Sequence, residues 1–326
     1  MARIVFMGSP DFAVPSLRAL VAAGHDLVGV VTQPDREAGR GRRLVPPAVK
    51  TVALELGLPV LQPPSLRRPE AVAQLAAPRP EAIVVAAFGQ ILRRAVLEIP
   101  PRGVLNVHAS LLPRWRGASP VTAAILAGDA ESGVSIMLVD EGLDTGPVLA
   151  TRSTPITDAD TGGTLTDRLA EIGAELLVET LPGRLDGTVK PKPQVEALAT
   201  YAPRIEKDAG QIGWSQPAVD IWRQVRAFNP WPGAFTTYAE TVLKLLDAWP
   251  LVGYSAEPPG TVLPLPWGAR DVVPAERPRP AFAVVTGEGF LLPLKLQRAG
   301  KRAIFAEEFL HGERALIGSR LVGVIA

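Results

Sequence analysis

The fold is decided first by residues 3–32, which read RIVFMGSPDFAVPSLRALVAAGHDLVGVVT. Residues 3–7 form a short apolar run that ends at a glycine, a serine and a proline, which predicts a buried strand followed by a turn. Residues 13–23 carry apolar side chains at helical spacing, and Gly24 then stands where helices commonly end. Residues 27–32 predict the next strand. The stretch therefore indicates a strand–helix–strand unit.

The same alternation continues to about residue 188. Further strands are predicted over residues 82–88, 104–108, 134–139 and 148–150, and helices over residues 46–56 and 164–181. Strands that alternate with helices are typical of parallel βαβ units, which form a doubly wound sheet with right-handed crossovers. We therefore expect residues 1–188 to form an α/β domain.

The pattern changes after residue 188. Residues 189–205 contain the run Lys190-Pro191-Lys192-Pro193, which is typical of a semi-extended linker. A helix is expected over residues 217–228, followed by short strands over residues 235–238, 242–248, 261–263, 281–285 and 290–297. Closely spaced strands separated by proline- and glycine-rich turns favour a small antiparallel barrel. It would occupy residues 206–326.

The composition is that of an ordinary globular protein and excludes several kinds of site. The chain has 326 residues, of which 47% are hydrophobic and 21% charged, and this length suggests about two domains. It contains no cysteine, so disulfides, thiolate catalysis and zinc–sulfur sites are excluded. With only three histidines we expect no metal centre. The net charge of +1 gives no general attraction for nucleic acid, so such binding would need a local basic patch.

No segment is predicted to cross a membrane. The apolar run over residues 82–88 is too short for a span, and residues 1–8 lack the basic start and long apolar middle of a signal peptide. We therefore expect a cytoplasmic protein with no membrane partner. Nothing in the sequence requires more than a monomer.

The first strand–helix turn does not have the pattern of a dinucleotide-binding site. It reads Gly8-Ser9-Pro10-Asp11-Phe12-Ala13, without the second and third glycines that let a backbone approach a pyrophosphate. No phosphate-binding loop ending in Gly-Lys-Ser/Thr occurs elsewhere. Chemistry on a nicotinamide or a nucleoside triphosphate is therefore disfavoured.

Two polar residues end the strand predicted over residues 104–108. Alternation along a strand places Asn106 and His108 on the same face at its carboxyl end. An asparagine amide donates a hydrogen bond, and a histidine donates one or transfers a proton near neutral pH. Together they could stabilise a carbonyl oxygen that becomes negative when a nucleophile adds to it. The alternative is a strand end whose polar side chains only meet water.

A carboxylate follows the strand predicted over residues 134–139. The turn reads Asp140-Glu141-Gly142-Leu143-Asp144-Thr145-Gly146-Pro147. Beside His108, Asp144 would orient the imidazole, favour its protonated form and help to take a proton from an attacking ammonium group. Aspartates also stabilise turns, and spacing alone leaves that interpretation open.

An arginine-rich loop follows the second strand. Residues 36–43 contain four arginines and two glycines. Guanidinium groups suit phosphates, and the loop would lie at the carboxyl ends of the strands, where sites form in parallel sheets. A solvated basic loop is the alternative.

Taken together, these motifs resemble the methionyl-tRNA formyltransferases, a family of folate-dependent formyltransferases. The resemblance covers nearly the whole chain and rests on residues 6–13, 32–36, 39–41, 87–92, 106–118 and 142–146, and on residues 226–232 and 296–301. It implies a Rossmann-like formyltransferase domain, a linker and an OB-like β-barrel domain that contacts tRNA. It also implies transfer of the formyl group of 10-formyltetrahydrofolate, as co-substrate, to the amino group of methionyl initiator tRNA. The product would be N-formylmethionyl-tRNA for translation initiation.

The resemblance assigns roles to individual residues. It implies that Asn106, His108 and Asp144 are catalytic. The implied folate contacts are Phe88, Gly89, Gln90, Ile91, Leu92, Ser110, Leu111, Leu112 and Pro113, and the implied tRNA contacts are Arg36, Arg40, Arg42 and Arg43. The chain departs from the family pattern at Ser9, Phe88 and Ala109, where threonine, tyrosine and glycine are common. None of these departures belongs to the catalytic trio.

Three alternatives are compatible with parts of this pattern. A formyltransferase acting on a small amine, such as a sugar nucleotide or glycinamide ribonucleotide, would use the same trio but would not need the arginine loop. A non-catalytic tRNA-binding protein would release no formyl group. A nicotinamide oxidoreductase is suggested by the fold alone and is opposed by the missing glycines.

Overall fold

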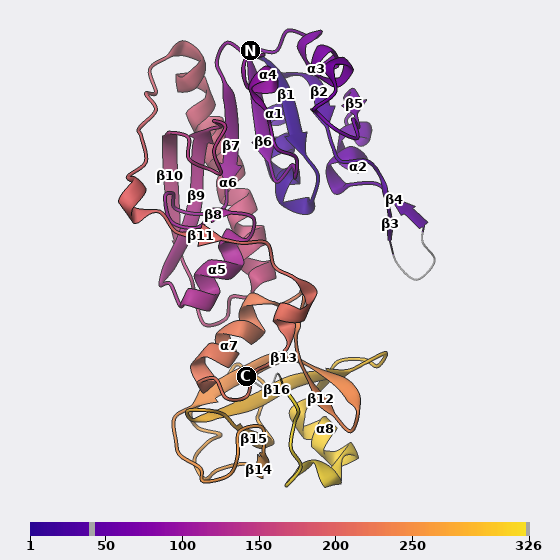
Figure 1. Ribbon diagram of the computed structural model, residues 1–326, viewed down its shortest axis with the longest axis vertical. Coiled ribbons are helices and arrows are strands. Elements are labelled where there is room, and N and C mark those ends of the chain that lie inside the picture. Colours follow the sequence, from indigo (N-terminus) through magenta and orange to yellow (C-terminus); the bar gives the residue numbers. More distant parts are fainter. Residues whose placement is uncertain (39–42, 324–326) are drawn as a thin grey trace. The chain divides into compact units, whose positions relative to one another are not determined.

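The computed structural model describes residues 1–38 and 43–323 (Figure 1). The chain divides into two compact units. The first combines Met1–Pro120, Glu131–Pro155 and Leu165–Pro203, and the second combines Val121–Ala130, Ile156–Thr164 and Arg204–Ala326. The segment interpreted above as a linker is thus part of the first unit as far as Pro203.

The first unit is built on a seven-stranded sheet in the order β10-β9-β7-β6-β1-β2-β5 (Figure 1). The strands are β1 (Arg3–Gly8), β2 (Asp26–Val31), β5 (Val60–Leu61), β6 (Ala82–Ala86), β7 (Val104–His108), β9 (Glu131–Leu138) and β10 (Val148–Pro155). The strands from β7 to β5 pair in parallel, as predicted. The other two extend the sheet with antiparallel pairing, because β9 runs opposite to both β7 and β10.

Helices cover this sheet with apolar side chains. They are α1 (Val14–Ala22), α2 (Ala48–Glu55), α3 (Pro69–Ala76), α4 (Arg94–Leu97) and α6 (Gly162–Asp186). The long helix α6 buries leucines and alanines at helical spacing, among them Leu165, Leu169 and Leu176. Its Gly173 permits a close approach, since a Cβ there would lie 2.7 Å from Cγ1 of Val107 on β7.

The strand order reverses between β1 and β6. From β1 the chain moves outward to β2 and β5, and it then returns to build β6 and β7 on the other side of β1. In open α/β sheets, ligands bind at the carboxyl ends of the strands beside such a reversal. In this protein those ends lead into the Gly8-Ser9-Pro10 turn and into the segment that starts at Ala87.

The second unit contains a six-stranded antiparallel sheet in the order β12-β13-β16-β15-β14, with β17 beside β16. The strands are β12 (Ala234–Tyr238), β13 (Thr241–Leu251), β14 (Val262–Pro264), β15 (Phe282–Val285), β16 (Phe290–Arg298) and β17 (Ile304–Phe305). The two ends of this sheet are joined by the last described residues, because Val322 pairs with Thr237 and Arg320 with Thr261. The sheet is therefore curled in the manner expected of a small barrel.

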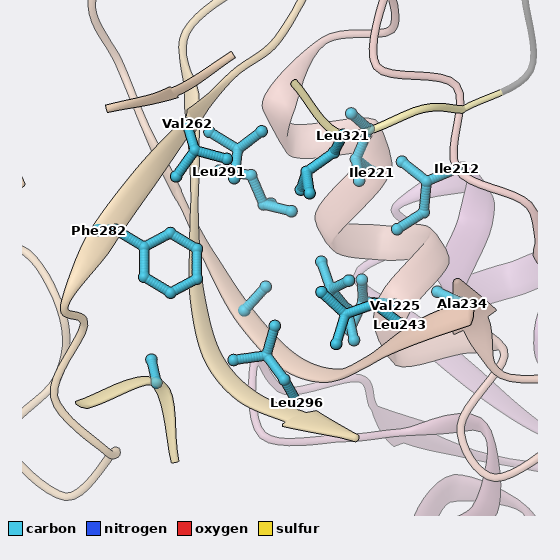
Figure 2. Packing of buried hydrophobic residues seen from close by; sticks show 14 of the residues in the cluster. Ile212, Ile221, Val225, Ala234, Leu243, Val262, Phe282, Leu291, Leu296 and Leu321 are labelled. Atoms are coloured by element: carbon cyan, nitrogen blue, oxygen red, sulfur yellow. The ribbon is translucent and has the colours of Figure 1, made fainter. Parts of the chain in front are cut away.

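A hydrophobic cluster fills the inside of the curled sheet. Figure 2 shows side chains from helix α7 (Ala218–Ala227), such as Ile221 and Val225, among Leu243, Leu291 and Leu296 from the strands. All of these are almost completely buried. The unit also includes α5 (Pro120–Ala127), except for its first residue, and α8 (Ala306–Gly312).

In the described part of the chain, none of the helices combines the length and the apolarity that crossing a membrane requires.

Candidate active site

Asn106 and His108 share one face of β7, as strand alternation predicted. Val107 between them points to the opposite face, where it contacts α6. Asn106 pairs with Val85 and Met137 on the neighbouring strands, so it lies inside the sheet rather than at its rim. The side chain of His108 is 7% exposed and that of Asn106 is partly exposed. His108 is therefore largely shielded from solvent, whereas Asn106 remains partly accessible.

Asp144 reaches His108 from a loop that turns back along the sheet. Because β9 is antiparallel to β7, Leu138 pairs with Leu105 at the start of β7, away from His108. The following loop returns, and it brings Oδ2 of Asp144 to 3.7 Å from Nδ1 of His108. The same oxygen accepts a 2.8 Å hydrogen bond from the backbone N–H of Gly117. The carboxylate is thus fixed beside the ring.

The other nitrogen of the imidazole is already engaged. Nε2 of His108 lies 3.0 Å from the carbonyl oxygen of Trp115, and a carbonyl only accepts hydrogen bonds. Nε2 must therefore carry a proton, and the Nδ1 edge faces Asp144. Ser110 donates from Oγ to the carbonyl of Arg114 at 2.6 Å, which holds the turn that supplies the Trp115 carbonyl.

Left-handed backbone conformations gather around these groups. Among the described residues, six non-glycine residues have positive φ, and they include Ala87 at 45°, Trp115 at 60° and Asp144 at 53°. Such conformations cost energy and persist where surrounding contacts impose them, which is common at functional sites. Ala87 follows β6, Trp115 lies in the turn after β7, and Asp144 lies in the loop after β9.

The residues expected to contact a folate donor differ in their exposure. Gly89 and Ile91 are exposed, whereas Phe88 and Leu92 are buried in the hydrophobic cluster of the first unit. The side chain of Gln90 bonds the backbone of Leu66 and Pro63. In the second segment, Ser110 and Leu112 are buried, while Leu111 and Pro113 are partly exposed. The described surface of these two segments is therefore formed mainly by Gly89, Ile91, Leu111 and Pro113.

The arginine-rich segment forms the ends of a small hairpin. Strands β3 (Arg36–Ala38) and β4 (Arg43–Val45) pair antiparallel, and both Arg36 and Arg43 are exposed. Arg40 and Arg42 lie outside the described residues. The base of the hairpin is anchored at Asp35, whose carboxylate accepts hydrogen bonds of 2.8 Å from Lys50 and from Gln62. These hydrogen bonds lower the pKa of Asp35, and the one from Lys50 has the larger effect.

The comparisons with known proteins agree with this arrangement. Residues 2–181 match the formyl transferase family, and residues 204–314 match the formyl transferase C-terminal domain. The methionyl-tRNA formyltransferase of Pseudomonas paraeruginosa is 48% identical over 96% of this chain and 96% of its own length. That of Roseiflexus sp. is 50% identical over 98% of this chain and 95% of its own length. The chain belongs to the methionyl-tRNA formyltransferase family.

Solved structures with a similar fold are less similar to this chain in sequence. An N-formyltransferase from Helicobacter canadensis, in complex with folinic acid and dTDP-3-aminofucose, superimposes with a TM-score of 0.63 at 19% identity. That match covers 91% of this chain and 100% of the other. HypX from Aquifex aeolicus, in complex with tetrahydrofolic acid, gives a TM-score of 0.58 at 21% identity over 96% of this chain. The chain spans about half the length of HypX, with 47% covered, and these likenesses concern the fold alone.

The sequence analysis missed the residues that hold the loop after β7 and the loop of Asp144 in place. Arg116 is fully buried, and the pair β8 (Arg116–Gly117) and β11 (Tyr201–Ala202) joins the loop after β7 to the segment expected to be a linker. The side chain of Gln194 bonds the backbone of Asp144. These partners are separated by at least 50 positions in the sequence, so no local sequence pattern predicts their contacts.

We expect Gly117→Ala to lower formyl transfer about 10-fold or more. Gly117 has φ +112°, and a Cβ there would lie 2.6 Å from the backbone oxygen of Ala202, so the N–H that holds Asp144 must move. A misplacement of about 1 Å can cost on the order of 100-fold in rate. Steady-state turnover measures the effect.

Gly187→Ala is the matched control, because Gly187 has φ +84° and nothing lies within 4 Å of the position that a Cβ would take. Both variants carry the same kind of backbone penalty, but only one displaces the carboxylate. Equal turnover of the two variants would contradict the prediction.

Proposed function

We propose that the protein transfers the formyl group of 10-formyltetrahydrofolate to the amino group of methionyl initiator tRNA. The observation that carries this proposal is that Nδ1 of His108 lies 3.7 Å from Oδ2 of Asp144, with Asn106 on the same face of β7 as His108. Family membership supports the formyl donor and the acceptor. The product is N-formylmethionyl-tRNA for translation initiation.

In the reaction, the neutral amine of the methionyl ester attacks the formyl carbon. A new C–N bond forms, the C–N bond to the folate nitrogen breaks, and one proton passes from the amine to that nitrogen. The formyl oxygen gains negative charge on the way, and Asn106 and His108 donate hydrogen bonds to it. One well-placed donor is worth about 3–4 kcal/mol of barrier in such sites.

His108 acts through its Nδ1 edge, since Nε2 is held by the Trp115 carbonyl. The gap of 3.7 Å to Asp144 is longer than a hydrogen bond, so the two groups are close but not directly hydrogen-bonded. Asp144 orients the imidazole and accepts the proton that the amine loses, before that proton passes to the folate nitrogen. General acid–base assistance of this kind contributes about 10²- to 10⁴-fold.

The donor would bind along the segment from Phe88 to Leu92, which follows β6 at the reversal of strand order. The exposed Ile91 offers an apolar surface to a flat ring, and the exposed backbone at Gly89 lets a ligand come close. Ser110 to Pro113 would complete the site from the turn after β7. When bound, the folate supplies the activated formyl group.

The acceptor tRNA would bind through the hairpin of β3 and β4. Its described part exposes Arg36 and Arg43 together with Leu44 and Val45, which are 69% and 49% exposed. Guanidinium groups bind phosphates, and exposed apolar side chains on the same hairpin can pack against unpaired bases. Arg40 and Arg42 would add to the positive charge.

The proposed function is tested by a transfer assay with 10-formyltetrahydrofolate and purified charged tRNAs. We expect rapid formylation of methionyl initiator tRNA and much slower reaction of methionyl elongator tRNA. A panel of small amines, including amino sugar nucleotides, serves as the competing acceptors. Preference for a small amine, or no transfer with any folate donor, would overturn the proposal.

Alanine at any member of the trio should lower turnover by about 10²-fold or more without unfolding the protein. Asn106→Ala and His108→Ala each remove a donor to the formyl oxygen, and Asp144→Ala removes the proton acceptor. Glu141→Ala, an exposed carboxylate of the same loop, is the control and should keep wild-type turnover. Wild-type turnover in Asp144→Ala would remove that carboxylate from the mechanism.

Replacing Arg43 by alanine should weaken tRNA binding and change its salt dependence. Losing one phosphate contact makes the plot of log affinity against log salt shallower by about one unit. Arg152→Ala is the control, because that guanidinium already pairs with Glu175 and Glu179. Binding measured from about 50 to 200 mM salt decides the point. A slope identical to that of the wild type would exclude Arg43 from phosphate contact.

A further inference from the structure

The segment after α6 packs against the two loops that carry the candidate site. Lys192 pairs with Val148 at the start of β10. The backbone of Thr200 donates one hydrogen bond to the turn after β7 and accepts another from it. Oγ1 of Thr200 accepts a 2.9 Å hydrogen bond from the backbone N–H of Trp115, the residue whose carbonyl holds His108. A spacer between domains would not need such contacts.

Gln194 makes direct contacts with the loop of the carboxylate. Its Nε2 donates to the carbonyl oxygen of Asp144 at 2.8 Å and to that of Gly146 at 2.7 Å. Both N–H groups of the amide are therefore used on the backbone that flanks Thr145. Because Asp144 has φ +53°, its backbone is in a conformation that needs outside contacts to persist.

The orientation of the Gln194 amide is set by a buried cation. Oε1 of Gln194 accepts a 3.0 Å hydrogen bond from Nε of Arg116, whose side chain is fully buried. Nη1 of Arg116 pairs with Glu196 at 2.9 Å. A guanidinium only donates, so it fixes the oxygen of the amide toward itself and the nitrogen toward the two carbonyls.

We propose that Gln194 is a positioning residue that holds the backbone of Asp144 so that its carboxylate stays beside His108. This inference rests on the proposed function, because it concerns the carboxylate to which that function gives a role. Arg116 orients Gln194, Gln194 holds the loop of Asp144, and Gly117 holds the carboxylate itself. The segment that joins the two domains in sequence is thereby part of the catalytic machinery.

Gln194→Glu tests the amide while keeping its shape. The carboxylate retains a partner in Arg116, but its second oxygen faces two carbonyl oxygens and has no proton to donate. We expect turnover to fall about 10- to 100-fold, the effect of a small misplacement of a reacting group. The KM values for tRNA and folate should change less than about threefold, because no substrate contact is removed.

Gln224→Glu is the matched control. In the second unit, Nε2 of Gln224 donates to two carbonyls in the same way, to Ala209 at 2.9 Å and Gln211 at 3.1 Å. This variant should keep wild-type turnover. If both variants lose turnover equally, or if Gln194→Glu loses none, the proposal is overturned.

A double-mutant cycle separates this proposal from the proposed function. In the Asp144→Ala background, adding Gln194→Glu should leave the residual turnover unchanged, since the group that Gln194 positions is already gone. A further loss of the same size as in the wild type would mean that Gln194 acts elsewhere, and would overturn the proposal. Full activity of the single variant Asp144→Ala is a separate outcome, which would overturn the catalytic role of that carboxylate and with it the role of Gln194.

Discussion

The placement of the Asp144 carboxylate depends on one backbone hydrogen bond, from the N–H of Gly117 to Oδ2 of Asp144. That bond fixes the carboxylate oxygen that faces Nδ1 of His108. It requires Gly117 at φ +112° with no side chain, because the backbone of Ala202 lies against it. A carboxylate held only by its own flexible loop would move freely, and the 3.7 Å spacing would not be maintained.

The turn after β7 serves both partners of this pair. The carbonyl of Trp115 accepts a hydrogen bond from Nε2 of His108, and two residues later the N–H of Gly117 donates one to Asp144. The imidazole and the carboxylate are therefore positioned relative to the same short stretch of backbone rather than independently. A shift of this turn would therefore displace both groups.

The sequence could predict the strand that carries Asn106 and His108, but not how the loop after β9 brings Asp144 to His108. The run from Val104 to His108 is predicted with both ends correct, because apolar alternation is local. Asp144 reaches His108 only because the antiparallel strand β9 sends its loop back along the sheet, and pairing direction is not written in residues 131–138. The sequence around Gln194 does not predict its role either, because the fold brings it to Asp144, a residue 50 positions away in the chain.

In the proposed function, the choice of acceptor and the bond-making step belong to different segments of the chain. The trio lies at the end of β7 and in the loop after β9, whereas the exposed arginines lie on the hairpin between β2 and α2. Gln33 joins the hairpin to the segment after β6, because it donates to the carbonyl of Phe88 at 3.1 Å and accepts from Arg36 at 3.4 Å. A hairpin on a different segment from the trio can therefore change in sequence without disturbing the carboxylate.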